Sequence, residues 1–138
     1  MRFYIQADGG ARGNPGPAGS GAVVRDAEGN TILEVSEFIG HATNNVAEYT
    51  AIIRALEGLK ERLGADASQA TVTIEMDSKL VVEQMEGRWK VKHPNMRPLA
   101  ARAAVLALSF GHVSYAHIPR EKNGAADALA NAAMDRGQ

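Results

Sequence analysis

The chain opens with MRFYIQADGGARGNPGPAGSG, residues 1–21, where an alternating segment gives way at Asp8 to a run of glycines and prolines. Apolar residues at positions 3, 5 and 7 face the opposite way from Asp8, which is typical of a half-buried strand. We therefore expect a strand over residues 2–8 that ends at a carboxylate, followed by a tight loop.

The glycine run does not fit a nucleotide-binding loop. It contains neither the GxGxxG pattern between a strand and a helix nor a Walker lysine. Pro15 and Pro17 would also prevent immediate entry into a helix. We reject this interpretation.

Length and composition indicate one globular domain over residues 1–138, with 45% hydrophobic and 22% charged residues. No segment resembles a signal peptide or a membrane span, so we expect a cytoplasmic protein with no membrane partner. The chain has no cysteine, which excludes disulfides, zinc ribbons and iron–sulfur clusters. Any metal must be bound by oxygen or imidazole, which favours hard divalent ions.

The net charge of −1 conceals an uneven distribution along the chain. Residues 1–86 hold thirteen of the sixteen acids, whereas residues 87–120 hold six bases and no acid. A one-signed surface of this kind attracts polyanions. Charge alone leaves open whether the basic segment binds a polyanion or is only a solvated surface.

The periodicity along the chain predicts an α/β fold with one mixed sheet and helices packed on it. Strand patterns and helical patterns follow one another in the order β β β α β α α β α. After the first strand, we expect strands at 19–26, 30–40, 70–77 and 112–119, and helices at 44–64, 77–87, 98–109 and 124–135.

Four acidic residues occupy positions in the predicted elements where their burial or placement needs an explanation. Glu48 precedes Ile52 by four residues and falls on or beside the apolar stripe of its helix, so it needs a partner. Asp8 and Asp77 come near the carboxyl ends of strands, where open sheets tend to place ligand sites. Asp127 lies in the first turns of the last helix, where helix capping or the helix dipole is the favoured explanation for this residue taken alone.

Clustering of these acids would require a cation or protonation. Two carboxylates about 4 Å apart repel by roughly 4 kcal/mol at an effective dielectric constant near 20. With oxygen ligands alone, Mg²⁺ or Mn²⁺ is expected. Two such ions, about 4 Å apart, would activate a water and stabilise the leaving oxygen of a phosphodiester.

Four segments together resemble ribonuclease H type I, in the bacterial form that lacks a basic protrusion. They are ADGGARGNPGPAGSG, HATNNVAEYTAIIRAL, IEMDSKLVV and NGAADALA, and they occur in the family's order over essentially the whole chain. The resemblance implies an RNase H-like fold, a five-stranded mixed sheet with its first three strands antiparallel, flanked by about four helices. It also implies hydrolysis of the RNA strand of RNA–DNA hybrids, leaving 5′-phosphate and 3′-hydroxyl ends.

The same resemblance assigns roles to individual residues. Two divalent ions, Mg²⁺ or Mn²⁺, would be held by Asp8, Glu48, Asp77 and Asp127. Asn14, Asn44 and Asn45 match positions that contact the minor groove of the hybrid, and an amide can both donate to and accept from a 2′-hydroxyl. Thr43 and Asn95 match residues that bind a phosphate of the DNA strand, with His41 in place of the arginine often found there.

Two departures from the family pattern concern the substrate. The segment MEGRWKVKHPNMRPL is short, so hybrid affinity is expected to depend on Arg88, Lys90 and Lys92 and on an exposed Trp89. Many members carry a mobile histidine before the fourth aspartate. Here His117 falls within a strand, and Glu121 or Arg120 is expected to substitute for it.

Two other functions remain as alternatives: a hybrid-binding module that has lost catalysis, and another nuclease of the superfamily that acts on DNA. We expect a monomer whose partner is an RNA–DNA hybrid. The abrupt end of the chain is similar to bacterial relatives in which this domain precedes a phosphatase-like domain, so a fusion to a further C-terminal domain is also expected.

Overall fold

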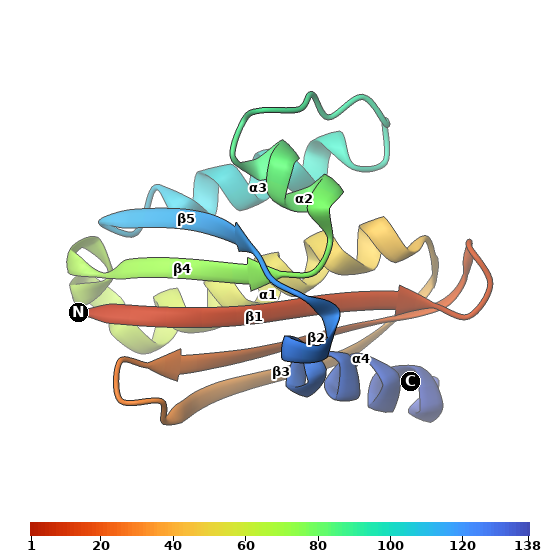
Figure 1. Cartoon of the computed structure of the whole chain (residues 1–138), viewed down its shortest axis with the longest axis horizontal. Helices are drawn as coiled ribbons and strands as arrows, with labels where there is room; N and C mark the ends of the chain where they lie inside the picture. The colour runs from red at the N-terminus through yellow and green to blue at the C-terminus, as the bar shows by residue number, and fades with distance from the viewer.

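A computed structural model describes all of residues 1–138 and contains one five-stranded mixed sheet flanked by four α-helices (Figure 1). The strand order is β3-β2-β1-β4-β5. Strands β1, β2 and β3 pair antiparallel, whereas β4 pairs parallel with both β1 and β5. The fold predicted from the sequence is confirmed. The elements are β1 (Arg2–Ala11), β2 (Gly16–Asp26), β3 (Thr31–Ala42), α1 (Asn44–Leu63), η1 (Gly64–Gln69), β4 (Thr71–Met76), α2 (Lys79–Met85), α3 (Arg97–Ala107), β5 (His112–His117), η2 (Arg120–Lys122) and α4 (Gly124–Arg136).

Helix α1 supplies much of the core because its buried side, from Ala47 to Leu59, is apolar except at Glu48 and the hydroxyl of Tyr49. Thr43 caps its N-terminus by accepting a hydrogen bond from Val46 N at 3.2 Å. Gly64, with φ of 56°, ends the helix at the predicted position. Helix α3 packs on α1, so the two cover the same side of the sheet. None of the four α-helices is long and apolar enough to span a membrane.

The glycines of the opening segment bring two helices close to the sheet from opposite faces. Gly9 lies so near the α1 backbone that a Cβ there would overlap the carbonyl carbon of Ala47. Gly19 and Gly21 meet α4 in the same way, since their Cβ positions fall on the carbonyls of Ala130 and Ala126. Successive side chains of a strand point to opposite faces, so this alternation places α1 on one face and α4 on the other.

The boundaries of the first two strands differ from the prediction. Strand β1 continues to Ala11, and β2 begins at Gly16 rather than residue 19, so the loop is only residues 12–15. The glycines therefore lie mainly in strands, where they permit close helix packing. Asp8 consequently lies inside β1 and not at its end.

Candidate active site

Three acids from different elements converge at one point of the sheet. Asp8 comes from β1, Glu48 from α1, and Asp77 from the residue that follows β4. One carboxylate oxygen of each lies within 4.8 Å of those of the other two. Asp8 and Glu48 are buried, at 9% and 7% exposed, and Asp77 is half-buried. The predicted convergence of these three residues is confirmed.

The end of β4 opens the space in which these acids meet. Strands β1 and β4 pair in register only as far as Gln6 and Glu75, after which β1 continues beside β2 alone. Ser78 then caps α2 by accepting a hydrogen bond from Val81 N at 3.3 Å, so the chain turns away immediately after Asp77. Asp8 is thereby left without a neighbouring β4 residue on that side.

Helix α1 is held where Glu48 reaches this opening. Gly9 allows its backbone to approach β1, and the buried Ser20 hydroxyl donates to the carbonyl oxygen of Ala47 at 2.7 Å. These two contacts act on the first turn of α1, next to Glu48. Gly9 and Ser20 of the opening segment therefore position an acid that lies 39 and 28 residues further along the chain.

Burial and mutual repulsion make the cluster favour protonation in the absence of a cation. Burial raises the pKa of Asp8 to about 7, with further contributions from the charge of Asp77 and a hydrogen bond with Asp127. Burial also raises the pKa of Glu48 to about 8, reinforced by the charges of Asp8 and Asp77. Glu48 Oε1 is buried and has no hydrogen-bond partner. An unpaired buried carboxylate oxygen beside two other carboxylates suits a hard divalent cation.

Asp127 stands beside the three acids rather than among them. It lies on α4, within hydrogen-bonding reach of Asp8 but outside the group whose oxygens share the 4.8 Å separation. Two polar hollows of about 300 Å³ meet here, and Asp8 and Arg120 border both. One hollow also contains Glu48 and Asp77, and the other contains Asp127. Asp8, Glu48 and Asp77 therefore form one group and Asp8 and Asp127 form another, with Asp8 common to both.

The three candidate minor-groove residues lie at the edge of the acidic hollows. Asn14, in the loop between β1 and β2, donates through Nδ2 to Asn44 Oδ1 at 2.9 Å, and its Oδ1 accepts from Asn44 N at 3.1 Å. Asn44 and Asn45 begin α1 and line the hollow that contains Glu48. These contacts bring the loop of the opening segment to the start of the helix that carries Glu48.

The predicted phosphate-binding residues are brought together by the structure. Thr43, His41 and Asn95 line one hollow of about 600 Å³, although Asn95 is more than fifty residues distant in the sequence. His41 is exposed, and the Thr43 hydroxyl already accepts from the α1 backbone. A hydroxyl, an amide and an imidazole at one opening can donate hydrogen bonds to an anion.

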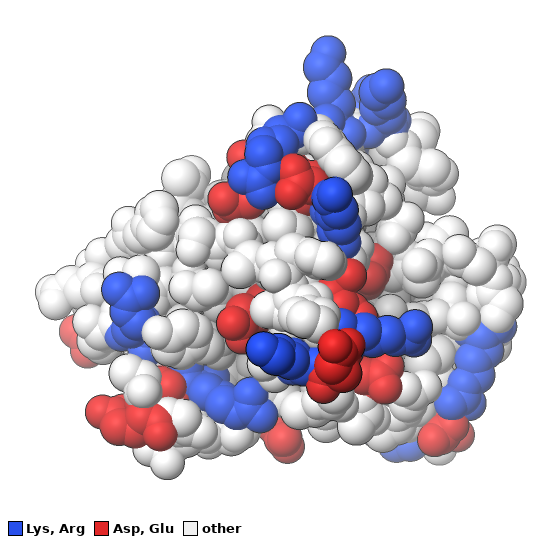
Figure 2. All heavy atoms as spheres, in the orientation of Figure 1, with Lys and Arg blue, Asp and Glu red and all other residues white.

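The basic segment after α2 is only partly available. Trp89 is 45% exposed, as expected from its basic neighbours. Arg88, in contrast, donates to both carboxylate oxygens of Glu83, at 2.6 and 2.9 Å. Lys90 is exposed and makes no ion pair. On the face shown in Figure 2, basic side chains stand over the connection between α2 and α3, above acidic side chains near the middle of the view.

The two candidates for the missing histidine are placed differently. Arg120, in η2, borders both acidic hollows, whereas Glu121 is exposed and borders neither. His117 lies in β5, as predicted, although it is the last residue of that strand, and its Nε2 lies 3.2 Å from the carbonyl oxygen of Asp77. Of the two candidates, Arg120 alone is placed beside the acids.

Sequence reasoning missed two polar residues that support the acids. Ser78 borders the same hollow as Glu48, and its side chain lowers the pKa of that carboxyl against the effect of burial. Asn123 is 1% exposed and donates through Nδ2 to Asp77 Oδ1 at 3.3 Å. Asn123 lies within the NGAADALA segment, but an asparagine directly before a helix is ordinarily a cap, so the pattern alone concealed its contact with the acids.

A family model described as "Reverse transcriptase-like" matches residues 6–133. The bifunctional protein Rv2228c of Mycobacterium tuberculosis is 54% identical over 98% of the chain, which spans 36% of that protein's length. A structure of its N-terminal RNase H domain has a TM-score of 0.90 and 51% identity, covering 98% of this chain and 100% of that one.

Two further proteins are similar over nearly their whole length. Ribonuclease H of Polaromonas naphthalenivorans is 35% identical over 99% of this chain and 89% of its own. The structure of LC11-RNase H1 in complex with an RNA/DNA hybrid has a TM-score of 0.91 and 48% identity, covering 97% of each chain.

Proposed function

Since the chain belongs to the ribonuclease H family, we propose that it is an endoribonuclease that hydrolyses the RNA strand of RNA–DNA hybrids. The observation that carries this proposal is the convergence of Asp8, Glu48 and Asp77, with Asp127 beside Asp8. The similar LC11-RNase H1 was solved with an RNA/DNA hybrid bound, which supports the same substrate class here. The products would carry 5′-phosphate and 3′-hydroxyl ends.

The four acids would hold two divalent ions, Mg²⁺ or Mn²⁺. Asp8, Glu48 and Asp77 would form one site and Asp8 with Asp127 the other, since Asp8 borders both hollows. Bound there, the ions would supply Lewis acidity to activate water and to stabilise charge on the leaving oxygen. Burial of Asp8 and Glu48 limits the mobility of these two carboxylates, so the protein's own contribution would be a fixed geometry.

Recognition of the hybrid would involve both edges of the site. Asn14, Asn44 and Asn45 present amides beside the acids, where they would contact the sugar edge and the 2′-hydroxyls of the RNA strand. The hollow lined by Thr43, His41 and Asn95 would accept a phosphate of the DNA strand. Trp89 and Lys90 would extend this contact along the DNA.

Arg120 would act beside the acids in the place of the family's mobile histidine. Its position between the two hollows allows a guanidinium to contact a phosphate oxygen near the reacting bond. Arginine stays charged at neutral pH, so it would bind and release an anionic product and would not transfer a proton. Glu121 has no comparable position.

Asp77→Asn tests the assignment of the acids. Loss of this carboxylate should reduce cleavage of a hybrid by more than about 100-fold, because even outer partners of metal ligands are worth about 10- to 100-fold. Hybrid binding, measured by fluorescence anisotropy, should be retained. Asp66→Asn, at an exposed acid of η1, controls for the loss of charge and should cleave normally. Unchanged cleavage by the Asp77 variant would refute the assignment.

A substrate panel separates this function from its alternatives. The wild-type protein should cleave a hybrid in Mg²⁺ or Mn²⁺ but leave duplex RNA and duplex DNA intact. Cleavage of duplex DNA would indicate a DNA-processing nuclease, and binding without any cleavage would indicate an inactive module. A hybrid with one ribonucleotide extends the panel to the minimum ribonucleotide run. We also propose a fusion to a further domain, as the length of the mycobacterial relative suggests.

A further inference from the structure

Asn123 is a buried side chain that bridges two strands at the point where they separate. It lies between η2 and α4 and is 1% exposed. Its Nδ2 donates to the carbonyl oxygen of Ala7 at 3.0 Å and to Asp77 Oδ1 at 3.3 Å. A primary amide has two N–H donors, so one side chain can serve both acceptors.

The backbone of Asn123 contacts the other members of the site. Its N–H donates to the carbonyl oxygen of Arg120 at 2.9 Å, and its own carbonyl accepts from Asp127 N at 3.1 Å. Ala7 immediately precedes Asp8 in β1. Through its side chain and backbone, this single residue is therefore linked to the strand of Asp8, to Asp77, to the turn of Arg120 and to the helix of Asp127.

The bridge replaces pairing that the sheet no longer provides. The β1–β4 ladder ends at Gln6 and Glu75, and the residues that follow in these two segments are no longer paired with each other. Asn123 occupies this gap and donates to one group on each side. A hydrogen bond to a carboxylate is stronger than one between neutral groups, so the amide fixes the orientation of Asp77 as well as the separation of the strands.

We propose that Asn123 is a positioning residue that aligns Asp77 and the Asp127 helix with Asp8, so that the four carboxylates are preassembled to bind the two divalent cations. This inference rests on the proposed function and deepens it. Asn123 touches no reacting atom; it acts by holding the carboxylates that would bind the ions.

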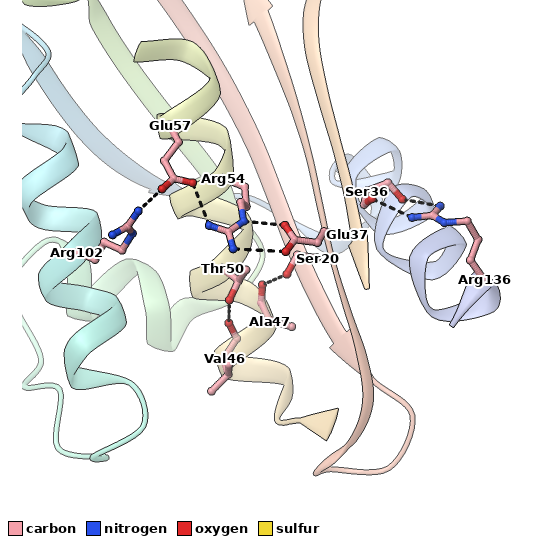
Figure 3. Close-up of polar contacts among 10 residues, drawn as sticks. All are labelled: Ser20, Ser36, Glu37, Val46, Ala47, Thr50, Arg54, Glu57, Arg102 and Arg136. Carbon is pink, nitrogen blue, oxygen red and sulfur yellow. Dashed lines mark hydrogen bonds and ion pairs between the residues drawn. The ribbon is translucent and has the colours of Figure 1, made fainter. Parts of the chain in front are cut away.

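Asn123→Leu tests the proposal, with Ser36→Ala as a matched control. Leucine has a similar volume but cannot donate a hydrogen bond. Ser36 also anchors α4 to the sheet, because its Oγ donates to the Leu129 carbonyl at 2.7 Å, but it lies on β3 and contacts none of the four acids. Arg136 donates to the same serine at 3.1 and 2.9 Å (Figure 3). Both variants should loosen the attachment of α4, but only Asn123→Leu should also disturb the acids.

Calorimetric titration with Mn²⁺ alone, without hybrid, provides the readout. Asn123→Leu should weaken Mn²⁺ binding by about 10- to 100-fold, whereas Ser36→Ala should bind like the wild type. The Mn²⁺ concentration for half-maximal cleavage should rise by the same factor, with the KM for the hybrid unchanged. Wild-type Mn²⁺ affinity in Asn123→Leu, or an equal loss in Ser36→Ala, would overturn the proposal.

A second variant guards against misfolding. If circular dichroism shows that Asn123→Leu is unfolded, Asn123→Ser is tested in its place, because serine keeps a small polar group that is too short to reach both acceptors. Asn123→Ser should weaken Mn²⁺ binding in the same way. Wild-type Mn²⁺ affinity in Asn123→Ser would overturn the inference. A wild-type protein that binds Mn²⁺ without cleaving a hybrid would refute the proposed function, while the same titrations would still decide the role of Asn123.

Discussion

At the scale of single residues, Asp8 and Glu48 are held in an environment that favours their protonated forms. Both are buried, and each lies near the charge of Asp77. Their pKa values, about 7 and about 8, stand well above the ordinary values of 3.8 and 4.5. The metal-free protein therefore binds more protons at these residues when folded than when unfolded, and a divalent cation must displace them.

The stability of the metal-free protein should consequently fall as the pH rises. A raised folded-state pKa stabilises the fold below the unfolded pKa, and this contribution is lost as the pH rises through the folded value. In EDTA, the melting temperature should decrease between about pH 5 and about pH 8. Adding Mn²⁺ at the upper pH should restore it, because metal binds the deprotonated acids.

Glu48→Gln provides the control for this titration. The amide carries no charge at any of these pH values, so the variant should lose part of the pH dependence and be more stable than the wild type in EDTA at the upper pH. A wild-type melting temperature that stays flat or rises over this range would contradict the raised pKa values of Asp8 and Glu48.

At the scale of elements, the glycines of β1 and β2 decide how closely the helices approach the sheet. The carbonyl oxygen of Ala126 in α4 occupies the space that a Cβ at Gly21 would need, and Gly19 stands in the same relation to Ala130, at 2.6 Å. Backbone cannot move aside as a flexible side chain can. The distance of Asp127 from Asp8 therefore depends on residues that carry no functional group.

Gly21→Ala should destabilise the protein by about 1–3 kcal/mol or more, the usual cost of overpacking a close contact. Gly124→Ala is the matched control, since nothing lies within 4 Å of its Cβ position and it begins α4. It should be neutral or stabilise the fold by about 0.4–1 kcal/mol. Urea unfolding measures both changes. Equal stability of the two variants would show that α4 does not depend on this close approach.

At the scale of the whole molecule, some basic side chains are held in ion pairs with acids of the same chain, whereas others form no ion pair. Arg102, Glu57, Arg54 and Glu37 form a chain of ion pairs that joins α3, α1 and β3 (Figure 3). Arg88 is likewise held by Glu83. Such exposed pairs contribute little to stability, but they remove basic side chains from the set that can bind a polyanion.

Lys90→Ala and Arg88→Ala should therefore differ in their effect on hybrid affinity. Release of counterions from the nucleic acid makes binding salt-dependent, and loss of one phosphate contact lowers the slope of log affinity against log salt by about 1. Lys90→Ala should show this loss, whereas Arg88→Ala should change the slope much less. Fluorescence anisotropy at several salt concentrations measures it, and equal slopes for the two variants would contradict the role of the Glu83 pair.

Much of the fold and the candidate site could be predicted from the sequence. The alternation before Asp8, the helical spacing around Glu48 and the stop at Gly64 are local patterns, and the structure confirms the elements that they predict. The catalytic and substrate-binding roles, the cytoplasmic location and the monomeric state stay predictions. The extent of β1 and β2 was predicted wrongly, because a glycine run indicates a loop unless the packing of helices against it is known.

The sequence by itself determined which residues are chemically able to form a cation site, because the absence of cysteine and the placement of four acids are properties of the chain alone. Only the tertiary structure decided how those acids are grouped, which arginine lies beside them and which is held by Glu83. It also revealed Asn123 as their support. These contacts join residues far apart in the sequence, and local periodicity carries no information about the distance between elements.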